Sequence, residues 1–128
     1  MGRNDDHIPT EIRGIAAERR VVIGWESGEE FSYPMEYLRV GCPCADCRGH
    51  MPSQRKLIFG KRDVTIETME AVGHYAIKIH FSDGHDTGVY SWGTLYELGA
   101  HQERFWADYL EELKAAGKSR VSIPIVAV

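Results

Sequence analysis

Three cysteines, Cys42, Cys44 and Cys47, fall within six residues and form the pattern C-x-C-x2-C. Thiolates are soft ligands, and three so close in the chain can surround one ion while leaving a fourth tetrahedral position open. Gly41 and Pro43 suit the tight turn that such a cluster requires. The odd, crowded set is a poor disulfide framework, and an iron–sulfur cluster usually takes four cysteines. The cluster therefore predicts a zinc site, with iron as the alternative metal and three reduced thiols as the alternative without metal.

The residues alone do not identify the fourth ligand, because the chain has six histidines. His50 is the nearest and would extend the pattern to C-x-C-x2-C-x2-H. His85 directly follows the turn Ser82-Asp83-Gly84, where a side chain can be aimed sharply. If the fourth position stayed open, the site would suit catalysis, with Asp86 or His80 as the general base.

The elements that lead into the cysteines are predicted to be short. Val21–Trp25 is β-branched and aromatic and predicts a strand that Pro9–Arg13 could pair with. A Ser27-Gly28 turn returns the chain through Phe31–Tyr33. Pro34 suits the first position of a helix that runs directly into the cysteine cluster.

The second half of the chain contains the clearest strand and two helices. Apolar and polar residues alternate from His74 to Phe81, with Tyr75, Ile77, Ile79 and Phe81 on the apolar side. Before it, Val64–Val72 predicts a strand or an irregular connection, and after it Asp86–Tyr90 returns. Ser91 can cap a helix that Gly99 ends. An amphipathic helix is predicted over Gln102–Ala116, ended by Gly117.

Two stretches share an order of residue types. Val22–Glu30 matches Lys78–Asp86, each with a strand that ends in an aromatic residue, a turn glycine and further polar residues. Each is followed by a short helix. This pattern suggests a strand–turn–strand–helix repeat in which the cysteines follow the first copy and His85 opens the second. A metal shared by these residues would join the two halves.

Length and composition predict a single α+β domain: a small antiparallel sheet of hairpins, short helices and a longer C-terminal amphipathic helix. The 128 residues carry a formal net charge of 15 − 19 = −4, without the basic excess of a nucleic-acid binder. No apolar run is long enough for a membrane span, and no signal region follows Met1, so we expect a cytoplasmic protein with neither nucleic acid nor membrane as partner. The domain is predicted over residues 1–120, followed by an apolar tail, 121–128. This tail is compatible with a homodimer, as is an aromatic stripe made of Trp92, Tyr96, Phe105, Trp106 and Tyr109.

Two distant motifs resemble one family. Tyr37–Arg48 contains the cysteines, and Phe81–Trp92, followed by Leu95–Gly99, contains the Asp-Gly-His turn. Together they are similar to the gamma-butyrobetaine hydroxylase-like N-terminal domain family, over roughly Ile8 to Arg120. In eukaryotes this domain precedes the catalytic part of carnitine-pathway dioxygenases, and in bacteria it often stands alone with unknown function.

The resemblance implies a small α+β fold and a zinc ion held by Cys42, Cys44, Cys47 and His85. It does not imply an oxygenase, because that chemistry needs two histidines and a carboxylate on a double-stranded β-helix, for which the chain is too short. His101-Gln102-Glu103 only imitates part of that triad. We expect a non-catalytic zinc-binding accessory module that serves an unknown protein partner. The alternative is an accessory protein of metal or iron–sulfur cluster assembly, with a labile cysteine site.

Overall fold

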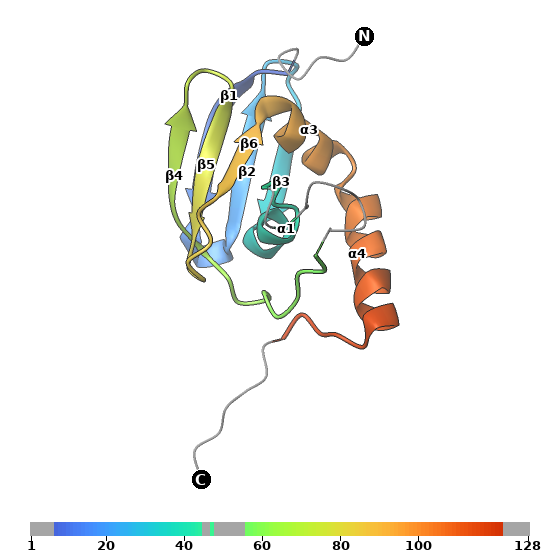
Figure 1. Ribbon diagram of the computed structural model, residues 1–128. Helices are drawn as coiled ribbons and strands as arrows, with labels where there is room; N and C mark the ends of the chain where they lie inside the picture. Colours follow the sequence, from blue (N-terminus) through green and yellow to red (C-terminus); the bar gives the residue numbers. More distant parts are fainter. Residues whose placement is uncertain (1–6, 45–46, 48–55, 122–128) are drawn as a thin grey trace.

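The cysteines are preceded by a three-stranded antiparallel sheet, shown in blue and cyan in Figure 1. The computed structural model describes residues 7–44, 47 and 56–121. The sheet has the order β1 (Pro9–Ile15), β2 (Arg20–Trp25) and β3 (Glu30–Pro34). A short 3-10 turn (η2, Ala16–Glu18) joins the first two strands, and α1 (Met35–Val40) follows the third.

A second sheet repeats this plan. It has the order β4 (Ile66–Val72), β5 (Ala76–Phe81) and β6 (Gly88–Ser91), all antiparallel, and α3 (Trp92–Ala100) follows directly. The long helix α4 (Gln102–Ala116) completes the chain's regular structure, on the side of Figure 1 opposite β4. This arrangement confirms the predicted α+β class and shows two small sheets where the sequence predicted one.

The predicted repeat is confirmed by matching hydrogen bonds in the two halves. The backbone N–H of Gly28 donates to Trp25 at 2.9 Å, and that of Gly84 donates to Phe81 at 3.0 Å. Both glycines have positive φ, 93° and 86°, which is the conformation their turns require. The first strand of each half also has a register shift at the same place, after Pro9 and after Ile66. Each unit therefore contains three strands, one more than the sequence pattern had indicated.

The two halves share one core and are joined by reciprocal hydrogen bonds. Tyr33 in β3 donates its hydroxyl to the carbonyl of Leu95 in α3 at 2.7 Å, and Tyr90 in β6 donates to Leu38 in α1 at 2.5 Å. Both tyrosines are fully buried. Each helix therefore accepts a hydrogen bond from the sheet of the other half, and the core of each half is completed by the other half.

Three details of the strands and helices were predicted wrongly. Tyr75 is 59% exposed because β5 begins only at Ala76, so the apolar alternation includes a residue of the preceding turn. Pro34 has ψ 142°, which makes it the last residue of β3 and not the first of the helix. Gly99 lies inside α3 and does not end it. A Cβ there would lie 2.4 Å from the Phe31 ring, so this glycine permits close packing.

The last helix agrees with its predicted bounds. It ends at Gly117, whose φ of 67° allows the N–H groups of the helix end to reach the carbonyls of Leu113 and Lys114. Tyr109 and Leu113 are buried, whereas Leu110 is 40% exposed and does not belong to the core stripe. No helix in the described part of the chain is both long and apolar enough to cross a membrane. Of the predicted tail, residues 122–128 lie outside the described residues.

Candidate metal centre

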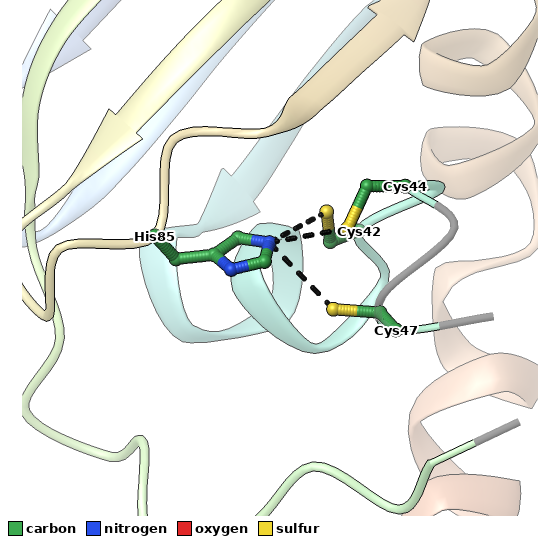
Figure 2. A group of neighbouring side chains, drawn as sticks. All are labelled: Cys42, Cys44, Cys47 and His85. Atoms are coloured by element: carbon green, nitrogen blue, oxygen red, sulfur yellow. Dashed lines mark hydrogen bonds between the residues drawn. The ribbon is translucent and has the colours of Figure 1, made fainter. Parts of the chain in front are cut away.

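The side chains of Cys42, Cys44, Cys47 and His85 converge on one point (Figure 2). The Nε2 atom of His85 lies 3.1, 3.4 and 3.6 Å from the three Sγ atoms in that order, and all four ligand atoms lie within 4.8 Å of one another. A tetrahedral zinc with ordinary bond lengths separates its sulfur and nitrogen ligands by about 3.6 Å. One histidine nitrogen can share a single proton with one sulfur, so three sulfurs around it are better explained as a ligand set.

The first three members of the cluster are positioned by the end of α1. The last turn of this helix is closed by two hydrogen bonds. The N–H of Gly41 donates to the carbonyl of Tyr37, and the N–H of Cys42 donates to the carbonyl of Arg39. The N–H of Cys47 donates to the carbonyl of Cys44 at 3.2 Å, and the three sulfurs face the ring of His85 (Figure 2).

His85 comes from the other half, in the turn between β5 and β6. The Oδ1 atom of Asp83 accepts a hydrogen bond from the His85 N–H at 3.1 Å, and the His85 carbonyl accepts one from Phe81 at 2.9 Å. These two hydrogen bonds therefore fix the backbone at His85 independently of the contacts between its ring and the sulfurs. The hypothesis that His85 and the cysteines bridge the two repeats agrees with this geometry.

The site is buried on one side and accessible on the other. Cys42 and Cys47 are 0% and 4% exposed, while Cys44 and His85 are half-buried. Gly88 lies against the cluster, where a Cβ would come within 2.7 Å of the Cys42 Sγ. The sequence analysis missed Gly88, because nothing in its local pattern distinguishes it from an ordinary strand glycine.

Burial is the largest influence on the pKa of each of the three thiols. It raises the pKa of Cys42 to about 12 and also raises the pKa of Cys47, where contact with the Cys44 thiol adds to the effect. Cys44 is different. Burial would raise its pKa, but hydrogen bonds from the Thr87 side chain and the Cys47 backbone outweigh this and lower it. A metal that binds here must displace protons from the two buried thiols.

Charged residues around the cluster were also missed by the sequence analysis. Arg39 is buried, and its Nε donates to the Oδ2 of Asp83 at 2.9 Å while its NH1 lies 3.5 Å from the Cys47 Sγ. Lys61 contacts the same carboxylate oxygen at 2.7 Å. Burial would raise the pKa of Asp83, but the hydrogen bonds from Lys61 and Arg39 outweigh it and lower the pKa to about 2. The signal available in the sequence was weak: an arginine three residues before Cys42 and an aspartate two before His85.

The other candidate residues lie elsewhere. His50 lies outside the described residues. His80 is hydrogen-bonded to Glu70 on the neighbouring strand. His101 pairs with Glu97 at 3.1 Å, so it belongs to the junction of α3 and α4 and not to the cysteine cluster. Asp86 is exposed.

Fold and side chains together define a class: a small α+β domain in which cysteines from one half meet a histidine from the other. The family model described as "Gamma-butyrobetaine hydroxylase-like, N-terminal" matches residues 12–96, and the chain belongs to this family. The resemblance noted in the sequence is thereby confirmed.

Several known proteins are similar to this chain. Dioxygenase str8 of Strobilurus tenacellus is 33% identical over 100 residues, which cover 73% of this chain, and the chain spans only 22% of that relative's length. A solution structure solved by NMR is 37% identical with a TM-score of 0.81 and covers 100% of this chain and 96% of its own. A second NMR structure is 38% identical with a TM-score of 0.79, covering 95% and 97%.

A crystal structure gives a further match. It shows a protein of unknown function from Acidithiobacillus ferrooxidans that belongs to the DUF971 family. That protein is 38% identical with a TM-score of 0.61, and the match covers 72% of this chain and 92% of that one. The solved structures therefore include a protein of unknown function with a similar fold.

Proposed function

We propose that this protein is a non-catalytic zinc-binding accessory module whose metal joins the two repeats. The observation that carries the proposal is the convergence of three sulfurs from the first half on the His85 Nε2 of the second, at 3.1 to 3.6 Å. The donor set suits zinc, since three thiolates and one imidazole form a closed site of the structural type. Cys42, Cys44, Cys47 and His85 would hold the ion, and it would supply folding energy without an open coordination position.

The relatives support an accessory role. The family description places such domains at the N-terminal end of hydroxylase-like proteins, and the similar dioxygenase is several times longer than this chain. By analogy, we propose that this module serves a protein partner in the cytoplasm.

The direct test is metal content and stability measured together. Elemental analysis of natively purified protein should give about one zinc per chain, as expected for a closed site. Cys44→Ser should reduce that content and lower the melting temperature in the same preparation. His85→Asn should do likewise, while His74→Asn, at an exposed position, serves as the matched control and should change neither. Metal-free protein that melts at the same temperature before and after Cys44→Ser would refute the proposal.

A second candidate function is the transfer of metal or an iron–sulfur unit. It is favoured by the position of Cys44, whose thiol is half-buried and has a lowered pKa, two properties that favour a reactive thiolate. A transfer site should lose its metal to a mild chelator within minutes and should take up iron under anaerobic conditions. Slow exchange, together with no iron-dependent visible absorption after reconstitution, would exclude it.

A further inference from the structure

We propose that Arg39 is a positioning residue that covers Cys47 and thereby makes the bound metal slow to leave. The inference rests on the proposed zinc site and concerns how firmly that site holds its ion. Zinc with three thiolates and a neutral imidazole carries a net charge of −1. A charge of that sign beside a buried sulfur needs a compensating cation, and the outer partners of ligands commonly set metal affinity.

Arg39 is placed to supply that charge. Its side chain is 8% exposed and its NH1 lies 3.5 Å from the Sγ of Cys47, which is itself buried. A guanidinium that donates to a metal-bound sulfur lowers the sulfur's electron density and blocks the approach of electrophiles and competing ligands. The Sγ of Cys47 is therefore in direct contact with a charged donor from its own half of the fold.

The guanidinium is held in place by the same carboxylate that fixes the histidine. The Oδ2 of Asp83 accepts from the Arg39 Nε at 2.9 Å, and its Oδ1 accepts from the His85 N–H at 3.1 Å. Arg39 thus connects a cysteine of the first half to the histidine turn of the second, without being a ligand. Displacing the guanidinium would loosen both sides of the site.

The fork geometry of arginine distinguishes this role from that of a simple buried ion pair. One nitrogen of Arg39 contacts the carboxylate while another faces the sulfur. A lysine has a single nitrogen and cannot hold both positions at once. Lys61 offers the matched control, because it is a second cation on the same Asp83 oxygen, at 2.7 Å, whereas Arg39 also contacts the Cys47 sulfur.

The experiment uses the full chain loaded with zinc. Zinc release to a chromophoric chelator is timed, and limited alkylation with iodoacetamide is mapped to individual cysteines by mass spectrometry. Arg39→Gln should speed release about tenfold and should increase the rate of Cys47 modification relative to that of Cys42, which is also buried. Arg39→Lys should also increase the modification of Cys47, with a smaller change in the release rate, and Lys61→Gln should resemble the wild type.

The outcomes separate this inference from the proposed function. Wild-type protein that binds no zinc would refute the zinc site itself. Wild-type protein that holds zinc, with zinc release and the modification of Cys47 unchanged in Arg39→Gln, would refute the role of Arg39 alone. Should Arg39→Gln fail to fold, Arg39→Lys decides the question, since modification of Cys47 at the wild-type rate in that variant overturns the proposal.

Discussion

Asp83→Asn is the substitution whose effect the structure defines most sharply. The asparagine keeps an oxygen that can accept from the His85 N–H but loses the charge that faces Arg39 and Lys61. We expect a loss of stability at neutral pH that disappears in acid, where the wild-type carboxylate is itself protonated.

The magnitude follows from the pKa of Asp83, which is about 2 in the folded protein against an ordinary value of 3.8. At about 1.4 kcal/mol per pKa unit this difference corresponds to roughly 2 kcal/mol. The carboxylate side chain is 19% exposed and its Lys61 partner 27%, so solvent screening reduces the expected contribution to about 1–2 kcal/mol. The folded pKa is the lower one, so the stabilisation is complete above about pH 5 and is lost as the pH falls through 3.8 towards 2.

The assay is urea unfolding followed by tryptophan fluorescence, in excess chelator so that metal contributes equally to every variant. At pH 7 the midpoint of Asp83→Asn should lie about 0.5–1 M below that of the wild type, and the gap should narrow steadily to pH 3. Asp63→Asn is the control, since Asp63 pairs with Arg19 on the surface, with side chains 72% and 56% exposed. It should change stability by less than about 0.5 kcal/mol. A gap that is absent at pH 7, or that does not narrow between pH 5 and pH 3, would refute the reasoning.

Four further predictions concern the packing of the core and the binding of metal at the site. Gly88→Ala should weaken zinc binding roughly tenfold, because its Cβ would lie 2.7 Å from the Cys42 Sγ; competition with a chelator measures this. Gly99→Ala, whose Cβ would lie 2.6 Å from the Tyr33 hydroxyl, should cost about 1–3 kcal/mol in chemical unfolding and leave zinc affinity unchanged. Tyr33→Phe should cost about 1 kcal/mol, from the lost hydrogen bond to Leu95, again with normal zinc content. Zinc binding at pH 7 should release protons, because burial raises the pKa of Cys42 to about 12; calorimetry in buffers of different ionisation enthalpy would show this, and a buffer-independent enthalpy would contradict it.

Residue types within short stretches of the sequence determined many of the strands, turns and helix ends of this protein. The β-branched run Val21–Trp25, the Ser27-Gly28 turn and the cap at Ser91 each act over a few residues, and the structure confirms them. The bounds of Gln102–Ala116 followed from its apolar periodicity and from Gly117. The order of residue types also contained the internal repeat, and the paired motifs indicated the family.

Only the tertiary structure decided which residues of one repeat contact which residues of the other. Cys47 and His85 are far apart in the chain, and their meeting depends on how one half packs on the other. The contact of Arg39 with both Asp83 and Cys47 has the same origin, as has the need for glycine at position 99 inside a helix. Distances between side chains of different elements are set by packing in the shared core. A pattern of residue types within a short stretch of sequence therefore cannot predict them. The sequence therefore determined which donors the protein has, and packing determined which of them come together.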